Sequence, residues 1–147
     1  MSVHHYEVEV RWSGATTDYR SYSRNHEARV PGRPPIPSTA DPKFRGDESR
    51  WNPEQLLVAS LSECHMLWYL HLCAEAGIVV TDYHDAAAGV MDNVSFRSVT
   101  LRPRVTITDA ARADAARELH TEAHKRCFVA NSMNFPVTHE PQIVTGA

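Results

Sequence analysis

The sequence lacks a block of either charge sign. The net charge of −3 is small for 147 residues, and the lysines and arginines form no run. Nucleic-acid-binding surfaces need a basic stripe, so the sequence argues against this class of partner. There is also no internal repeat and no low-complexity tail. Together with the length, this predicts one domain over residues 1–147.

Secretory and membrane-spanning segments are missing as well. The N-terminal residues are charged and rich in histidine, with no apolar core of a signal peptide. Glu63, His65 and His71 interrupt the most apolar stretch of the chain, and a membrane span needs a run of about 18 apolar residues. We therefore expect a cytoplasmic protein that does not bind membranes.

Cysteine is scarce, with three in the chain. In a cytoplasmic protein this number indicates reactive or buried thiols rather than a disulfide framework. Cys64 and Cys73 would lie about 13.5 Å apart along one helix, too far for a disulfide, which needs Cα atoms within about 7 Å. Cys73 is therefore predicted to be a small buried side chain. Cys127 falls on another element, so its pairing with Cys64 stays open.

A long helix over residues 52–76 is the central prediction. Asn52 suits the N-cap, Pro53 the first helical position, and Gln55 completes a capping box. Gly77 is a typical C-terminal stop. Because its apolar residues point in nearly every direction, this helix should be buried on all sides. A chain of this length cannot easily wrap it, so we expect a partner subunit to cover part of it.

Hydrophobic periodicity places the remaining elements around this helix. Strands are predicted over residues 3–12 (half-buried), 26–30, 78–83, 96–107 and 135–144, and residues 86–91 either continue the 78–83 strand or pair with it. A long ordered loop is predicted over 33–51, and an amphipathic helix over 109–126. In that second helix, Ala111, Ala115, Leu119 and Ala123 should face the core. Pro103 places its strand at an edge or a bulge. The predicted fold is α+β, with antiparallel sheet packed against the long helix.

A reactive Cys64 would need a nearby cation to favour its thiolate, because a free thiol ionises only at about pH 8.5. Four arginines that precede the helix are candidates: Arg20, Arg24, Arg45 and Arg50. Glu54, at the second helical position, either complements the helix dipole or orients an arginine through a bidentate pair. Glu54 and Cys64 would lie about 15 Å apart on a straight helix. One arginine that contacts both would therefore require a bend or another segment.

Histidines suggest a different class of site. His120 and His124 lie one turn apart around Glu122, with Cys127 three residues further on, and this set could bind zinc. It is not the H-E-x-x-H order of metalloproteases. The alternative is a solvated helix face. His71, near the Cys64 face of the long helix, is expected to be a satisfied core histidine.

Two segments resemble the OsmC/Ohr family of peroxide-reducing proteins. Residues 52–66, NPEQLLVASLSECHM, are similar to the segment in which that family's Asn-Pro-Glu opens the helix carrying its first cysteine. Residues 127–132, CFVANS, are similar to the segment that holds its second cysteine. The order and separation of the two segments also match.

The resemblance implies an OsmC/Ohr-like fold in which sheets wrap the central helices of an intertwined homodimer, with active sites at the subunit interface. It implies reduction of organic hydroperoxides, and possibly of hydrogen peroxide, by cysteine without a metal, flavin or other cofactor, in defence against oxidative or osmotic stress. Cys64 would be the peroxidatic nucleophile and Cys127 the resolving cysteine, re-reduced by a thiol or dithiol. Glu54 matches the glutamate that pairs with the family's active-site arginine.

The chain lacks the Gly-Gly-Arg turn that carries this arginine in the Ohr branch, and His65-Met66 follows Cys64, so it resembles an OsmC-like branch. Arg24 is the first choice for the arginine, with Arg20 and Arg45 as alternatives. Leu61, Trp68 and Phe128 are predicted to line a pocket for an alkyl tail. The alternative to a peroxidase is a zinc-binding or small-ligand-binding protein with the same fold.

Overall fold

The computed structural model describes residues 2–146. The chain divides into two compact units, which meet in sequence between Leu56 and Leu57, inside the long helix α1 (Pro53–Glu75). The first unit therefore includes the start of α1, and the second includes the remainder of it.

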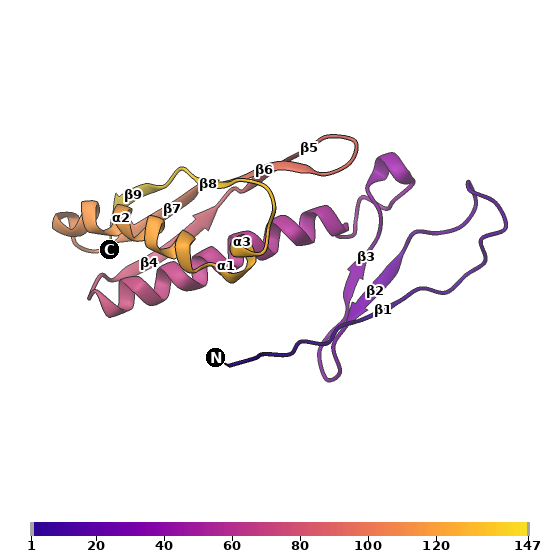
Figure 1. Cartoon of the computed structure of the whole chain (residues 1–147), viewed down its shortest axis with the longest axis horizontal. Helices are drawn as coiled ribbons and strands as arrows, with labels where there is room; N and C mark the ends of the chain where they lie inside the picture. Colours follow the sequence, from indigo (N-terminus) through magenta and orange to yellow (C-terminus); the bar gives the residue numbers. More distant parts are fainter. Residues whose placement is uncertain (1, 147) are drawn as a thin grey trace. The chain divides into compact units, whose positions relative to one another are not determined.

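The first unit is built on a three-stranded antiparallel sheet in the order β1 (Glu9–Arg11), β2 (His26–Arg29), β3 (Ile36–Ser38) (Figure 1). The predicted strand over 26–30 is confirmed as β2. The half-buried strand over 3–12 is wrong: only three of its residues pair with β2, and all three are exposed. The apolar–polar alternation of residues 3–12 is not enough to form a strand, because most of these residues have no pairing strand among the described residues. Tyr6, on the predicted buried face, is 87% exposed as a result.

The segment predicted as a loop over 33–51 contains β3 and a short 3₁₀ helix, η1 (Pro42–Phe44). The carboxylate of Asp41 caps η1 by accepting the Lys43 N–H at 2.8 Å. The chain then folds back so closely that a Cβ atom on Gly46 would lie 1.6 Å from the carbonyl oxygen of Ala40. Only glycine allows this approach, so the segment has a defined path before α1 begins.

The predicted ends of the long helix are confirmed. The Gln55 N–H donates to Oδ1 of Asn52 at 2.9 Å, and the Asn52 N–H donates to Oε1 of Gln55 at 3.0 Å, which is a complete capping box. Gly77, two residues past the end of α1, adopts the left-handed conformation with φ 71°. The Ile78 N–H closes the last turn on the carbonyl of Cys73 at 2.9 Å.

The second unit contains two three-stranded sheets. Their strands are β4 (Val80–Asp85), β7 (Pro103–Ile107) and β9 (Gln142–Thr145) in one sheet, and β5 (Ala88–Met91), β6 (Phe96–Leu101) and β8 (Val137–His139) in the other. The pairs β4–β7 and β5–β6 are antiparallel, as predicted, whereas β7–β9 and β6–β8 are parallel.

The predicted strand over 96–107 breaks into β6 and β7 at Arg102. Its N–H donates to the side-chain Oδ1 of Asp85 at 2.6 Å instead of to a backbone carbonyl of a paired strand. Pro103 begins β7, which lies between β4 and β9, so its predicted place at a sheet edge is wrong. Proline is tolerated there because it is the first residue of the strand.

The second predicted helix begins as a 3₁₀ turn, η2 (Ala110–Arg112), which Asp109 caps, and continues as α2 (Ala113–Arg126). A single turn, α3 (Phe128–Asn131), follows. The fully buried residues of α2 are Ala116, His120 and Ala123. In the predicted row, Ala123 is confirmed, Ala115 and Leu119 are partly buried against the same core, and Ala111 is exposed because it lies in η2.

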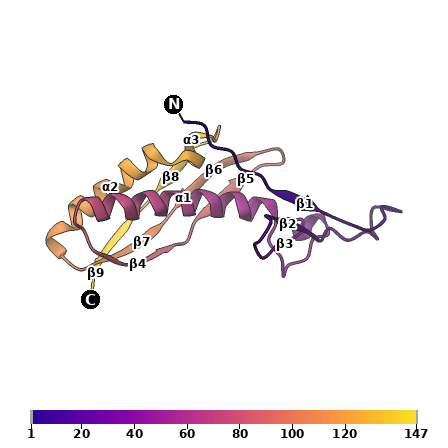
Figure 2. The ribbon, with the colours of Figure 1, turned by 90° about the horizontal axis from the view of Figure 1, so that it is seen from below.

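Helices α1 and α2 lie side by side in the second unit (Figure 2), and both pack on β7. One core cluster joins Tyr69, Leu72 and Cys73 of α1 to Val105 and Ile107 of β7 and to Ala116 and Ala123 of α2. A second joins Leu61 of α1 to Val99 and Leu101 of β6. The predicted α+β class and long helix are confirmed.

The chain by itself does not bury α1 on all sides, and Leu67 is 62% exposed. By length and composition alone, α1 is apolar enough to cross a membrane, so Glu63, His65 and His71 do not exclude a span as predicted. Core helices of water-soluble proteins meet the same criteria. The buried contacts of α1 with α2 and β7 are those of a core helix.

Candidate functional site

Two of the three thiols lie together in the second unit. Cys64 is half-buried in the middle of α1, and Cys127 is 1% exposed at the junction of α2 and α3. The Cys127 N–H donates to the carbonyl of His124 at 3.3 Å, and its Sγ accepts the Ala130 N–H at 3.5 Å. These contacts fix Cys127 at the end of α2, where its thiol lies close enough to Cys64 for Cys64 to raise its pKa.

The two thiols differ in their electrostatics. Burial, with a smaller contribution from the neighbouring Cys64, raises the pKa of Cys127 to about 11, against the opposing effect of the Ala130 N–H. Cys127 is therefore a neutral thiol at pH 7. Cys64 is the more accessible sulfur of the pair, which suits it to the role of nucleophile.

Cys73 behaves differently. Its side chain is buried in the core, and burial raises the pKa of its thiol despite a hydrogen bond with Tyr69. The prediction that Cys73 is a small buried side chain is confirmed. All three cysteines are free thiols in the structure.

Aromatic side chains near the end of α2 form part of the surface around the thiols. The rings of Trp68 and Phe128 meet edge to face with centres 5.5 Å apart, and the guanidinium of Arg126 lies 5.7 Å from the centre of the Trp68 ring. Phe128 is exposed, and neither it nor Trp68 lines either of the two hollows described below. Leu61 is fully buried against Val99 and Leu101, so its predicted place in the pocket lining is wrong.

The first unit contains a cavity of about 540 Å³ that brings together two predicted site residues, Arg24 and Glu54. Its remaining lining is largely apolar and includes Trp12, Tyr22 and Phe44. Arg20 and Arg45, the alternative arginines, do not line it. Of these three arginines, Arg24 alone lines the same open hollow as Glu54.

Arg24 is held by its own loop. Its guanidinium donates to the carbonyl oxygens of Tyr22 and, at 2.7 Å, Tyr19, and it lies over both of their rings. Within residues 2–146, no ion pair joins Arg24 to Glu54. The bidentate Arg–Glu pair expected from the resemblance is therefore absent from this part of the chain.

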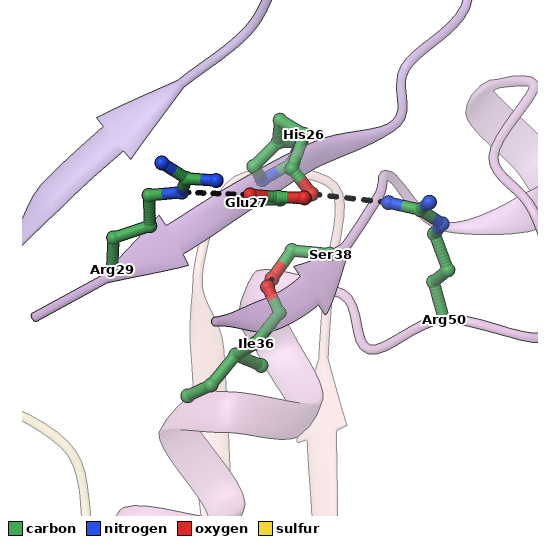
Figure 3. A network of polar contacts seen from close by, with 6 residues as sticks. All are labelled: His26, Glu27, Arg29, Ile36, Ser38 and Arg50. Carbon is green, nitrogen blue, oxygen red and sulfur yellow. Dashed lines mark hydrogen bonds and ion pairs between the residues drawn. The ribbon is translucent and has the colours of Figure 1, made fainter. Parts of the chain in front are cut away.

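The fourth candidate arginine, Arg50, has a different role in a separate polar hollow of about 270 Å³. Its guanidinium donates to the carbonyl of His26 at 3.2 Å, across from the 2.7 Å ion pair between Arg29 and Glu27 (Figure 3). Arg50 therefore tethers the segment before α1 to β2.

The predicted zinc set does not assemble. Glu122 pairs with Arg126 at 2.9 Å, and His120 is buried with His65. Among residues 2–146, no three histidine, cysteine or acidic side chains are arranged to hold a metal ion. The other reading of this motif, a solvated helix face, is also wrong for His120, which is 0% exposed.

Sequence reasoning missed a cluster of four histidines. Nε2 of His65 on α1 lies 3.0 Å from Nδ1 of His120 on α2. The ring of His139 on β8 lies with its centre 5.7 Å from that of His65 and 5.7 Å from that of His124. His65 falls in the i, i+4 row Leu61–His65–Tyr69, all of them buried, and this spacing could have indicated the cluster.

Burial, together with the neighbouring histidines, lowers the pKa of His65 to about 4 and that of His120 to about 3. Both rings are therefore neutral at pH 7, and one donates its N–H to the other. His71, the predicted core histidine, is instead exposed and forms an ion pair with Glu75 at 3.1 Å. It points away because it lies six residues after His65, on another face of α1.

Residues 46–142 match the model of the family described as OsmC-like protein. The chain belongs to this family. The match spans α1, both thiols and most of the second unit, which is the part of the chain that carries the resemblance expected from the sequence. No match to a curated protein was found.

Solved structures share the OsmC fold over nearly the whole chain. An OsmC-like protein of unknown function from Vibrio cholerae is 29% identical, with a TM-score of 0.86 over 95% of this chain and 99% of that one. An organic hydroperoxide resistance protein OsmC from Legionella pneumophila is 18% identical, with a TM-score of 0.64 over 95% and 97%. One from Elizabethkingia anophelis is 17% identical, with a TM-score of 0.65 over 97% and 99%. At 18% and 17% identity, the last two similarities show a shared fold and nothing more.

Proposed function

We propose that this OsmC-like protein is a thiol peroxidase that reduces organic hydroperoxides, with Cys64 as the nucleophile and Cys127 as the resolving cysteine. The proximity of the Cys64 and Cys127 thiols carries the proposal. It supplies a half-buried sulfur, a proton donor beside it and a second thiol within reach. Hydroperoxide resistance proteins share the fold.

In the first step, the Cys64 thiolate attacks the terminal oxygen of a hydroperoxide and breaks the O–O bond. The alkoxide leaves with a proton as an alcohol, and Cys64 becomes a sulfenic acid. In the second step, the sulfur of Cys127 attacks the sulfenic sulfur, forms the Cys64–Cys127 disulfide and releases water. An external thiol or dithiol then reduces the disulfide and restores both thiols.

The role of Arg24 is electrostatic in this proposal. A guanidinium stays charged at any physiological pH and stabilises both the thiolate and the developing alkoxide. Glu54 would orient it. The cavity shared by Arg24 and Glu54 supports the choice of Arg24 over Arg20 and Arg45.

Exposed apolar side chains support both an organic hydroperoxide as the substrate and a homodimer as the assembly. The exposed aromatic pair Trp68 and Phe128 suits the hydrocarbon of an organic hydroperoxide better than hydrogen peroxide, which has none. The exposed apolar residues of α1, such as Leu67, suit burial by a second copy of the chain. We place the protein in the cytoplasm, acting as a homodimer in stress defence.

The test is consumption of cumene hydroperoxide by the purified protein with dithiothreitol as the reductant. The wild-type protein should turn over repeatedly, and Cys64→Ser should reduce consumption to the level of dithiothreitol alone. Cys73→Ser, which removes the buried thiol that has no proposed role, is the matched control and should retain turnover. Turnover by Cys64→Ser would contradict the proposal.

A further inference from the structure

The hydrogen bond between His65 and His120 joins the same two helices that carry the thiols. His65 directly follows Cys64 on α1, and His120 lies seven residues, or about two turns, before Cys127 on α2. The two nitrogens are 3.0 Å apart, and the side chains are 1% and 0% exposed. The contact is therefore direct and dry.

A second polar contact lies further along the same interface. The hydroxyl of Tyr69 donates to the carbonyl of Ala116 at 2.9 Å, and the Tyr69 ring stacks on His120 with centres 3.8 Å apart. Residue numbers fall along α1 as they rise along α2, from Tyr69 with Ala116, through His65 with His120, to Cys64 with Cys127. The helices are therefore antiparallel, as Figure 2 shows. Cys64 and Cys127 lie beyond the histidine pair along the same helix interface.

Other ionisable groups surround the histidine pair on each packed element. They are Tyr69 on α1, Arg117 and His124 on α2, and His139 on β8. None of them replaces the His65–His120 contact, and Nε2 of His120 has no hydrogen-bond partner within the described residues. Burying two polar imidazoles, one of them with an unpaired nitrogen, costs folding free energy. This suggests a role that a pair of apolar side chains would not fill.

That role is geometric precision. Apolar side chains tolerate sliding of one helix along another, whereas a buried hydrogen bond has a preferred length and direction. Disulfide formation needs Cβ atoms within about 3.5–4.5 Å. A misplacement of about 1 Å can slow a positioned reaction by roughly 10²-fold. A contact that locks the register of α1 on α2 therefore controls how fast the two sulfurs join.

We propose that His65 and His120 are positioning residues whose hydrogen bond sets the separation of Cys64 and Cys127 for disulfide closure. They act through the helices and do not contact the reacting sulfurs. The inference rests on the proposed function for its biological meaning, since closure is the second step of that cycle. The contact itself can be tested without any peroxide.

The assay uses 2,2′-dithiodipyridine on proteins that carry Cys73→Ala. The more exposed thiol, Cys64, attacks the reagent and forms a mixed disulfide, and one thiopyridone leaves with a proton. Cys127 then attacks the sulfur of Cys64, forms the Cys64–Cys127 disulfide and releases a second thiopyridone. The second release is first order and measures closure separately from the reactivity of the first thiol.

Three variants define the expected result. His65→Leu removes the hydrogen bond and should slow closure by about tenfold or more. The pair His65→Gln/His120→Asn places amide nitrogens near the original ring nitrogens and should restore the rate to within about threefold. His120→Gln keeps an amide but moves it by one methylene, so it should close slowly although it can still form hydrogen bonds.

Tyr69→Phe is the matched control, because it leaves the histidine pair intact and removes a hydrogen bond to Ala116 that lies one helical turn further from the thiols than that pair. It should lower stability in a denaturant titration and leave the closure rate within about twofold of the parent. Wild-type closure in folded His65→Leu, or slow closure in the folded Gln/Asn pair, would overturn the proposal. If His65→Leu does not fold, His120→Gln decides, and closure at the parent rate overturns the proposal.

The proposed function fails on a different observation. A protein that closes its disulfide with dithiodipyridine but does not consume cumene hydroperoxide would leave the positioning role intact and remove the peroxidase. If the wild-type protein consumes peroxide while His65→Leu and His120→Gln both close the disulfide at the parent rate, the peroxidase proposal stands and the positioning role is removed.

Discussion

The guanidinium carbon of Arg24 lies 3.5 Å from the centre of the Tyr22 ring. A second ring, that of Tyr19, lies 4.9 Å from the same carbon, and carbonyl oxygens of both tyrosines accept its N–H groups. The loop therefore holds a fixed cation on the wall of a cavity; among residues 2–146 Arg24 forms no ion pair, although its charge helps to lower the pKa of Asp18 in the same loop. A cation that is fixed in advance stabilises developing negative charge at little cost in reorganisation.

Substitution of Arg24 by methionine should therefore impair catalysis rather than folding. We expect kcat/KM for cumene hydroperoxide to fall by about 10²-fold, the loss typical of one removed electrostatic donor. Arg20→Met, on the same loop but outside the cavity lining, is the control and should retain most activity. A larger loss in Arg20→Met or Arg45→Met than in Arg24→Met would contradict the assignment.

The buried histidines predict a loss of stability in acid. The folded-state pKa of His65 is about 4, below its value of about 6.5 in an unfolded chain, so the unfolded state binds more protons below pH 6.5. Stability should be full above this pH and fall progressively as the pH drops from 6.5 toward 4. Between pH 7.5 and pH 5, His65 and His120 should each remove about 2 kcal/mol from the free energy of unfolding.

Denaturant titrations at the two pH values measure this loss. The His65→Gln/His120→Asn variant should lose markedly less stability than the wild-type protein over the same interval, because its amides do not titrate. His71→Gln, which changes an exposed histidine of the same helix, should lose as much as wild type. Equal losses in wild type and the Gln/Asn pair would show that other groups govern the acid response.

The exposed face of α1 predicts a homodimer. Light scattering coupled to size-exclusion chromatography should give about twice the chain mass of 16.5 kDa. Leu67→Glu should shift the protein toward monomer, because a carboxylate buried in an apolar interface costs several kcal/mol. Val94→Glu, on the segment between β5 and β6 and 88% exposed, is the control. An unchanged dimer in Leu67→Glu would place the interface elsewhere.

The sequence was most informative where local signals act alone. Asn52, Gln55 and Gly77 set the ends of α1 through contacts within a few residues, and the structure matches them. The fold family could also be predicted, because the segments around Cys64 and Cys127 are distinctive. The burial of Cys73 followed from its place on an apolar helix.

Tertiary contacts decided the features that could not be predicted. The strand expected over 3–12 shortened because β2 offers only three pairing positions. Asp85 interrupts the ladder at Arg102 and makes two strands of one. His120 appeared to lie on a polar face, but α1 supplies both a ring and a hydrogen bond to cover it. No periodicity in α2 alone contains that information.

The most direct test of the account is peptide mass spectrometry after one equivalent of cumene hydroperoxide. We predict rapid formation of a disulfide between Cys64 and Cys127, with Cys73 still free, and a trapped sulfenic acid at Cys64 in Cys127→Ser. A protein that retains all three thiols after this treatment, or that links either cysteine to Cys73 instead, would contradict it.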